Sequence, residues 1–539
     1  MLDDGQVEEE LIPHCDPQPR ADLPVGLGSP QVARHIGDHL AGGQLPPPLA
    51  AEEARAGDRG HAGCRETQGS DPAHRRPLSY RGVPFPARII LSGACRASLG
   101  FVVRASGRRR IRAEARTTNG SPLDASPFFC DYLIRADSRD SWPIPGGCSV
   151  EIKLKYGLNP HQKFARLVIE REPSPLKIHN GTPGYINLLD LLGAWQLARE
   201  LKQATGLPGA ASFKHVSPAG AAVAKPLDEG FRVSQFIPEG EDLSPVATAY
   251  ARARGADRLC SFGDIAAVSD VVDASLARLI AREVSDGLIA PGYEPEALEI
   301  LKAKQGGRYL AVEIDPAYEP PELEYRDAFG FRLEQTRNTA KITRDLLRNV
   351  VSAKKDIPED AARSLLVCSV ALKYTQSNSV GLAYDGQVIG MGAGQQSRVH
   401  CTRLACGKAD KWLLQQHPRV LDLKFKKGLG RPEKTNIVDA YLLWDELAAA
   451  ERHWLLDQLD AAPEPLSRQE REEWVARFDG IACSSDAFFP FRDSIDRLSR
   501  TNVQYVMQPG GSARDDLVTE AADQYGMVMI HSGLRLFLH

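Results

Sequence analysis

The chain is organised around one stretch, Ala210-Ala211-Ser212-Phe213-Lys214-His215-Val216-Ser217-Pro218-Ala219-Gly220. A short apolar run ends in a lysine beside a histidine, and Ser-Pro-Ala-Gly then has the pattern of a turn that opens a helix. The pattern predicts that Lys214 and His215 lie where a strand turns into a helix, a crevice in which open α/β sheets bind ligands. There a histidine can accept a proton near neutral pH, and a lysine can hold developing negative charge. A Lys-His pair is also common on exposed surfaces, so spacing alone leaves a catalytic and a surface role open.

The composition is typical of a soluble globular protein of several domains. Of the 539 residues, 42% are hydrophobic and 25% are charged, and the net charge of −4 gives no indication of nucleic-acid or membrane binding. No run of about 18 apolar residues could span a membrane, and the acidic start Met1–Asp4 lacks the apolar core of a secretory signal. The ten cysteines form no Cys-x-x-Cys pair. We therefore expect no disulfide framework and a reducing, cytosolic location.

Residues 1–150 differ from the rest of the chain. They contain 18 Arg and no Lys, together with 16 of the 37 Pro and 17 of the 46 Gly. Hydrophobic periodicity is poor, and runs such as Gln44–Pro48 break any regular element. We expect an irregular segment, in which Arg108–Arg112 is a solvated charge run or a basic arm. The same composition would also result from a GC-rich stretch translated in a non-native frame.

From about Lys153 onward, helical and extended patterns alternate, which predicts an α/β fold with mostly parallel strands. Two units of similar size, 151–345 and 346–539, suggest a duplicated architecture. The clearest hairpin joins 379–384 to 387–391, because Asp-Gly fits a type I′ turn. The clearest helix covers 185–204, with apolar residues at helical spacing: Ile186, Leu189, Leu192, Leu197 and Leu201. Further helices are expected at 244–254, 274–284, 293–302, 358–374, 395–412, 437–452, 468–478, 491–499 and 513–525, and further strands at 287–290, 309–314, 480–483, 503–507 and 527–531.

Four polar stretches downstream fit a planar, anionic ligand. Amides in Lys373–Ser379 can read the edge of a planar amide, although Asn or Ser there could equally cap a helix. Gly390–Arg398 lets backbone approach an anion at a helix start, or is a plain glycine-rich turn. In Ser484–Asp493 aromatic rings can stack on a heterocycle, or simply pack in the core. Arg535 could bind phosphate or lie in solvent.

Three potential metal ligands, His400, Cys401 and Cys406, do not predict a metal site. On a helix, Cys401 and Cys406 do not share a face, and no fourth ligand accompanies them. The chain also lacks the His-x-Glu and Pro-Cys-x-x-Cys patterns of zinc deaminases. We therefore expect no bound metal.

Together these stretches resemble the transformylase part of the AICAR transformylase/IMP cyclohydrolase family, from about Leu154 to His539. The resemblance implies two tandem cytidine-deaminase-like units without zinc, and a homodimer with sites at the subunit interface. It also implies transfer of a formyl group from 10-formyltetrahydrofolate, the co-substrate, to the 5-amino group of AICAR in de novo purine (IMP) biosynthesis. The stretches that carry the resemblance are Lys155–Gln162, Phe213–Gly220, Tyr250–Gly263, Arg282–Tyr293, Tyr374–Ser379, Gly390–Arg403, Ser484–Asp493 and Leu534–Phe537.

The resemblance also assigns roles to individual residues. His215 would accept the proton of the attacking amine, and Lys214 would stabilise the transition state. Lys155 stands where the family has arginine, so the charge is kept but the bidentate fork for phosphate is lost. The positions that match AICAR contacts are Lys155, Tyr156, Gly263, Asp286, Asn378, Arg398, Phe488 and Arg535. Those that match folate contacts are Val399, Asp493, Ser512 and Ala513.

Residues 1–150 show none of the motifs of the family's N-terminal cyclohydrolase domain, so we expect no ring closure to IMP. Two alternatives remain: a full bifunctional enzyme with a diverged cyclohydrolase half, and a non-catalytic nucleotide-binding relative. A compact α/β domain in 1–150 would favour the first. The intact pair of Lys214 and His215 disfavours the second, because a protein without activity would be free to lose it.

Overall fold

The computed structural model describes residues 100–104, 112–116, 150–170 and 173–539. The chain divides into two compact units, Met1–Leu133 and Ile134–His539. In the first, β1 (Gly100–Arg104) pairs antiparallel with β2 (Arg112–Arg116). Almost all of the rest of the irregular segment expected over 1–150, with most of its basic run, lies outside the described residues.

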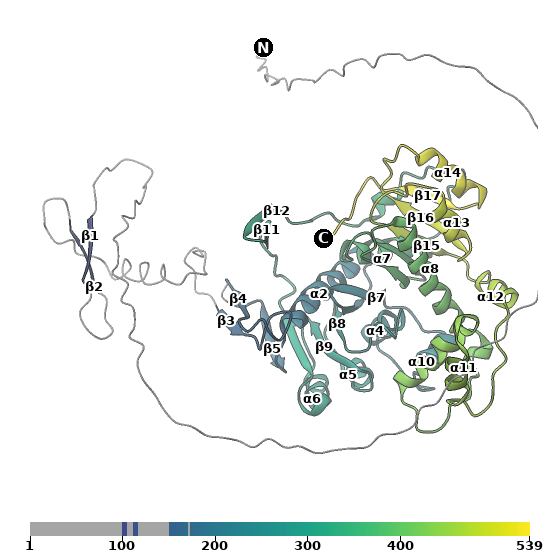
Figure 1. Ribbon diagram of the computed structural model, residues 1–539, viewed down its shortest axis with the longest axis horizontal. Coiled ribbons are helices and arrows are strands. Elements are labelled where there is room, and N and C mark those ends of the chain that lie inside the picture. Colours follow the sequence, from purple (N-terminus) through teal and green to yellow (C-terminus); the bar gives the residue numbers. More distant parts are fainter. Residues whose placement is uncertain (1–99, 105–111, 117–149, 171–172) are drawn as a thin grey trace, which may run out of the picture. The chain divides into compact units, whose positions relative to one another are not determined.

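The second unit is built on a mixed sheet with the strand order β17-β16-β15-β13-β14-β7-β6-β8-β9-β10-β5 (Figure 1). Two antiparallel hairpins, β3–β4 and β11–β12, stand outside this sheet. The fold is therefore α/β, as predicted. The strand bounds are β3 Val150–Lys153, β4 Arg166–Ile169, β5 Leu176–Asn180, β6 Gly209–Lys214, β7 Ser217–Val223, β8 Asp264–Val268, β9 Ser285–Ala290, β10 Leu310–Ile314, β11 Leu323–Ala328, β12 Phe331–Thr336, β13 Val380–Tyr384, β14 Gln387–Gly392, β15 Ile481–Ser485, β16 Val503–Gln508 and β17 Val528–His531.

The two halves of the sheet share one connectivity. The chain runs α2-β6-β7-α4-β8-α5-β9-α6-β10 through one half and α7-β13-β14-α8-β15-α13-β16-α14-β17 through the other, apart from short inserted elements. In each half two antiparallel pairings are followed by two parallel ones. β7 and β14 join the halves through the pair Ala222 and Gln387. The helix bounds are α2 Tyr185–Thr205, α3 Glu229–Ser234, α4 Pro245–Gly255, α5 Ala274–Ala281, α6 Pro295–Ala303, α7 Glu359–Lys373, α8 Arg398–Leu414, α9 Pro418–Leu421, α10 Arg431–Leu442, α11 Ala449–Leu456, α12 Arg468–Val475, α13 Asp493–Ser499 and α14 Asp515–Gln524.

The turn after Lys214 differs from the sequence-based prediction. Ser217–Val223 forms strand β7 and does not open a helix. His215 and Val216 both adopt left-handed backbone, with φ of 55° and 59°, and make a two-residue hairpin turn between β6 and β7. Turns of this kind match the right-handed twist of paired strands. Because tight hairpins open both halves, the expectation of mostly parallel strands is also wrong.

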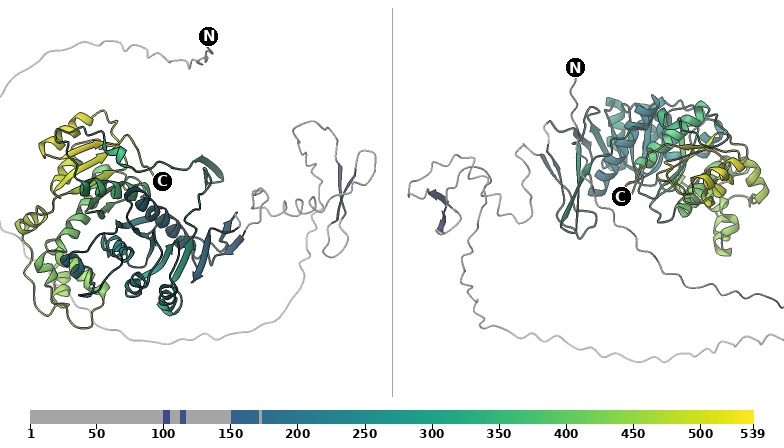
Figure 2. Two further views of the ribbon diagram at one scale, coloured as in Figure 1. Left: turned by 180° about the vertical axis from the view of Figure 1, so that it is seen from behind. Right: turned by 90° about the horizontal axis from the view of Figure 1, so that it is seen from above.

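Helices cover both faces of the sheet (Figures 1 and 2). Strand residues that point to one face, such as Phe213 and Ile265, pack with α2 and α7 in one hydrophobic cluster. Their neighbours Ala266 and Val268 point the other way and pack with α4, α5, α6, α8, α13 and α14. Among the described residues, no helix combines the length and apolar character needed to cross a membrane.

Most predicted elements are confirmed within a few residues, with two notable differences. The helix expected at 437–452 is two helices, because α10 ends at Leu442 and Glu451 caps α11 by accepting the Ala448 amide N–H at 2.8 Å. In α2, Leu197 and Leu201 are buried, but Ile186, Leu189 and Leu192 are 36–38% exposed. Leucines occur all round this helix, so periodicity alone did not identify the buried side.

Glycines set the distance between helix and sheet in both halves. A Cβ added to Gly220 in β7 would lie 2.1 Å from the carbonyl oxygen of Ala253 in α4. A Cβ added to Gly390 in β14 would lie 2.2 Å from the carbonyl oxygen of Ala405 in α8. Since no side chain fits at either place, the helices rest directly on strand backbone.

We expect Gly390→Ala to destabilise the protein by about 1–3 kcal/mol or more, because the new methyl overlaps backbone that cannot move aside. Urea unfolding followed by circular dichroism measures this change. The control is Gly407→Ala within α8, where an added Cβ meets no atom within 4 Å. This control should gain up to about 1 kcal/mol from helix propensity. Equal losses in the two variants would contradict the packing argument.

Candidate functional site

Most of the sequence-predicted site residues lie along one edge of the sheet. Lys214 ends β6 beside the start of β8, and Asp286 lies at the start of β9, next along the sheet. Because β14 runs antiparallel to β7, the same edge carries the start of β13 and the ends of β14 and β15. β6 and β13 are three strand spacings apart, roughly 14 Å. The residues therefore form two groups, one over β6, β8 and β9 and one over β13, β14 and β15.

The first group brings Lys214, Gly263 and Asp286 together. The Lys214 ammonium donates to the carbonyl oxygen of Phe262. A Cβ added to Gly263, whose φ is 71°, would lie 3.4 Å from Asp286 Oδ2 and 3.9 Å from Lys214 Nζ. The amine and the carboxylate thus border the small space that the absent side chain leaves. His215 follows at the exposed tip of the hairpin.

A buried guanidinium holds the backbone beneath this group. Arg254 of α4 donates to Asp264 Oδ1 and the Ser261 carbonyl, both at 2.7 Å, and to the Val284 carbonyl at 2.9 Å. Ser212 Oγ donates to the other oxygen of Asp264 at 2.6 Å, which ties β6 to the same cluster. Burial opposes the charge on Arg254, but the neighbouring Asp264, Tyr250 and Glu283 outweigh it and raise the pKa of Arg254.

Glu283 completes this cluster. It accepts from Arg258 at 2.8 Å and from Arg254 at 3.2 Å, and Arg431 of α10 lies 3.4 Å away. Burial alone would raise the pKa of Glu283, but the three guanidinium groups lower it below its ordinary value. Arg254, Asp264 and Glu283 are not among the site residues predicted from the sequence. Arginines between the alanines of a small-residue helix were the available signal, because a buried charge needs a partner.

The second group gathers around Asp486. Arg398, the first residue of α8, pairs with Asp486 and donates to Asn378 Oδ1 at 2.8 Å and to the Ser379 carbonyl at 3.0 Å. The C-terminal tail joins here, because the Leu536 amide donates to the Asp486 carbonyl at 2.9 Å. Arg535 therefore borders this group and is exposed, as is Phe488, which follows β15.

The residues expected to contact folate come from α8, α13 and the loop before α14. Val399 follows Arg398 in α8, and Asp493 is the exposed first residue of α13. Ser512 and Ala513 lie in the loop between β16 and α14. This loop meets the segment before α13, since the guanidinium carbon of Arg514 is 4.7 Å from the centre of the Phe491 ring.

Lys155 and Tyr156 lie outside the large sheet. They follow β3, Lys155 is exposed, and its ammonium lies 5.8 Å from the centre of the Tyr156 ring. Within the described part of the chain, no hydrogen bond or ion pair joins them to the other predicted site residues. Direct contacts within one chain therefore do not tie these two residues to the other predicted site residues.

Cys401 and Cys406 are buried against the sheet. Burial raises the pKa of each thiol to about 12, so both are neutral at ordinary pH, and a neutral thiol is a poor metal ligand. Cys401 Sγ lies 3.1 Å from the carbonyl oxygen of Asn378. In the described ranges no three His, Cys, Asp or Glu side chains gather in a metal-binding arrangement.

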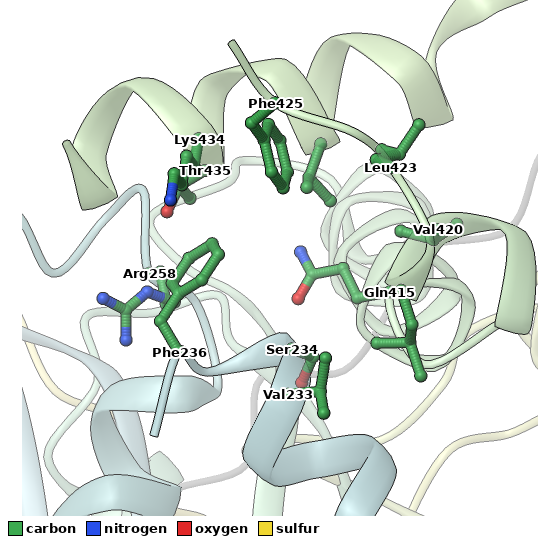
Figure 3. Close-up of a pocket in the computed structure, with 12 residues that line it drawn as sticks. Val233, Ser234, Phe236, Arg258, Gln415, Val420, Leu423, Phe425, Lys434 and Thr435 are labelled. Atoms are coloured by element: carbon green, nitrogen blue, oxygen red, sulfur yellow. The ribbon is translucent and has the colours of Figure 1, made fainter. Parts of the chain in front are cut away.

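A cavity of about 230 Å³ lies elsewhere, between α3, the end of α8 and α10 (Figure 3). The rings of Phe236 and Phe425 border it, and the amide of Gln415 points into it. None of the sequence-predicted site residues lines this cavity. It is therefore separate from both groups on the sheet edge.

Comparison with known proteins gives consistent matches. The AICARFT/IMPCHase bienzyme family matches residues 131–408. The bifunctional purine biosynthesis protein PurH of Roseobacter denitrificans is 30% identical over 393 residues. The proteins of the same name from Magnetococcus marinus and Cereibacter sphaeroides are 29% identical over 394 residues and 30% identical over 390. Each alignment covers 72% of this chain, and the chain spans 59% of the length of each relative.

We expect Glu283→Gln to destabilise the protein by about 3–5 kcal/mol at neutral pH, because it leaves buried guanidinium groups without their carboxylate. The lowered pKa of Glu283 means that its contribution is present above the unfolded-state pKa and is lost as pH falls through the folded-state pKa. The difference from wild type should therefore shrink in acid. Thermal and urea unfolding, followed from neutral pH down to about pH 2, measure it.

The control for this variant is Glu296→Gln, which removes a carboxylate from the exposed pair with Arg278. Exposed pairs contribute about 0–1 kcal/mol, so this variant should behave almost as wild type. A loss at Glu283 no larger than the loss at Glu296 would show that the buried cluster does not support the fold.

Proposed function

The chain belongs to the AICARFT/IMPCHase bienzyme family, and on this premise we propose that it transfers a formyl group from 10-formyltetrahydrofolate to the 5-amino group of AICAR in IMP biosynthesis. The observation that carries the proposal is the group formed by Lys214, Gly263 and Asp286 beside the exposed His215. A cation and a carboxylate lie there on either side of Gly263, and an accessible imidazole is the next residue after the lysine.

The chemistry requires a proton acceptor and a stabilised oxyanion. The 5-amino nitrogen attacks the formyl carbon, the carbonyl oxygen becomes negative, and the amine must lose a proton. His215 accepts that proton and returns it to the departing N10 of tetrahydrofolate. Lys214 offers its ammonium to the developing oxyanion once it leaves the Phe262 carbonyl. Two adjacent residues thus divide the work in this proposal: Lys214 stabilises the oxyanion, and His215 transfers the proton.

The second group supplies recognition in this proposal. The Asn378 amide reads the carboxamide of AICAR, the exposed Phe488 ring stacks on the imidazole, and Arg535 takes the phosphate with Lys155. Arg398 holds Asn378 in place through their 2.8 Å hydrogen bond. The folate binds beside them, at Val399, Asp493, Ser512 and Ala513.

We further propose two tandem cytidine-deaminase-like units without zinc, at 151–345 and 346–539, after a separate segment 1–150. The matched connectivity of the two halves of the sheet supports this division. The proposal includes no IMP cyclohydrolase activity; the alternative is a bifunctional enzyme whose cyclohydrolase half has diverged. We place the reaction in the cytosol, and the free thiols of all five cysteines in the described residues support a reducing location.

The proposed assembly is a homodimer with sites at the subunit interface. Hairpin β11–β12 leaves large apolar side chains exposed, and its Arg326 donates to the carbonyl of His539 beside the second group. A second copy would cover this hairpin and could bring Lys155 and Tyr156 to a complete site. The exposed side chains are Tyr325 (55%), Phe329 (100%), Phe331 (71%) and Leu333 (61%).

The first prediction of the proposal concerns His215. Wild-type protein should convert AICAR and 10-formyltetrahydrofolate to formyl-AICAR, without forming IMP at an enzymatic rate. His215→Ala should lower kcat by about 10²–10⁴-fold, as for a positioned acid–base group, with a much smaller change in AICAR affinity. Lys214→Ala should also lower kcat, and the two losses should not add in the double variant. A folded His215→Ala protein that turns over near the wild-type rate would refute the assignment.

The second prediction concerns assembly. In sedimentation velocity the wild-type chain should run as a dimer, and the double variant Phe331→Ser, Leu333→Ser should run as a monomer because it removes exposed apolar surface. Glu334→Gln, on the same strand, is the matched control and should remain dimeric. A monomeric wild type, or an unchanged dimer in the double variant, would contradict the proposed interface.

A further inference from the structure

A buried carboxylate contacts the backbone of the His215-Val216 turn. Asp190, in the second turn of α2, is 4% exposed, and its Oδ1 accepts the Val216 backbone N–H at 2.7 Å. Val216 is the second residue of the hairpin turn, and its φ of 59° is one that a β-branched residue rarely adopts. The backbone of the turn that contains His215 is therefore held by a hydrogen bond to this carboxylate.

The approach of α2 to β6 is what brings Asp190 there. A Cβ added to Gly193, one turn further along α2, would lie 2.9 Å from Cε1 of Phe213. Only glycine lets the helix lie this close to the strand that ends in Lys214. Leu191 and Ala194 beside it are fully buried, so α2 cannot shift without disturbing the core.

We propose that Asp190 is the positioning residue of the His215-Val216 turn. Its negative charge favours the protonated form of His215 during formyl transfer. The inference rests on the proposed function and deepens it. The hydrogen bond to Val216 sets the backbone of the turn, and the carboxylate stabilises the imidazolium that forms when His215 takes the amine proton. Asp190 itself neither gains nor loses a proton in this step.

The charges around the turn are consistent with this role. Burial raises the pKa of Asp190, and the Val216 amide and the charges of His215 and Lys214 act in the opposite direction. Lys214, on β6, is the cation next to His215, and Asp286, on β9, faces Lys214 across Gly263. Without Asp190, the charge of Lys214 would act on His215 with less opposition.

The burial of Asp190 also makes its role distinguishable from simple structural support. The pKa of this carboxyl group is higher in the folded state than in the unfolded state. It therefore destabilises the fold progressively as the pH rises from the unfolded-state pKa through the folded-state pKa. Asp190→Asn keeps an oxygen that can accept the Val216 N–H, and it removes the buried charge. This variant should therefore melt at the same temperature as wild type, or higher, at pH 7.

The experiment compares wild type, Asp190→Asn and a control in the full chain. The variant should lower kcat by about 3–10-fold with little change in KM for AICAR, and the acid limb of its pH–kcat profile should move to lower pH. In NMR with labelled histidine, the titration midpoint of His215, assigned by its absence in His215→Gln, should also move to lower pH. The control Asp270→Asn removes a carboxylate that pairs with Lys202 near the far end of α2, and should change none of these.

Two further measurements keep the inference testable. If Asp190→Asn does not fold, Gly193→Ala is the substitute test. It keeps the Asp190 carboxylate but moves α2 away from Phe213, and it should lower kcat to a similar extent. The NMR titration requires no turnover, so a wild type without formyl transfer would refute the proposed function and leave the shift at His215 to be measured. An unmoved titration midpoint and pH profile, or a fall in melting temperature with unchanged kcat, would overturn the role of Asp190.

Discussion

The buried guanidinium of Arg254 is the interaction on which the first half of the site depends. It joins the end of α4, the loop before β8, the start of β8 and the approach to β9 through Ser261, Asp264 and Val284. Those segments carry the Phe262 carbonyl, Gly263 and Asp286. An unpaired charge at this depth would cost several kcal/mol, so the surrounding backbone has little freedom to rearrange.

Glycine residues set the distance between the helices and the sheet. Gly220 and Gly390 occupy matching strands in the two halves, and each lets a helix rest on strand backbone at a distance that a methyl group would not allow. Gly193, on the helix itself, lets α2 lie close to the side chain of Phe213. At these places the helix and the sheet approach more closely than a side chain would allow. Because α2 lies this close to β6, Asp190 can accept the Val216 N–H of the hairpin turn.

The edge of the sheet collects polar residues from distant parts of the chain. Asn378, Arg398 and the C-terminal tail meet around Asp486, while Lys214 and Asp286 meet around Gly263 about three strands away. Most residues of the two groups are among those predicted from their stretches and from the family resemblance. That these residues would fall into two groups could not be predicted from stretches that each describe only local sequence.

Sequence alone determined the α/β class, most helices and strands, and the hairpin at Asp385-Gly386, because these depend on local periodicity and turn chemistry. It also identified the family, since long ordered motifs carry that information directly. Only the tertiary structure decided that Ser217–Val223 is a strand, since pairing with β6 outweighs a local Ser-Pro helix signal. It likewise decided the partners of Arg254 and the place of Asp190, because a buried charge is defined by contacts between segments that are far apart in sequence.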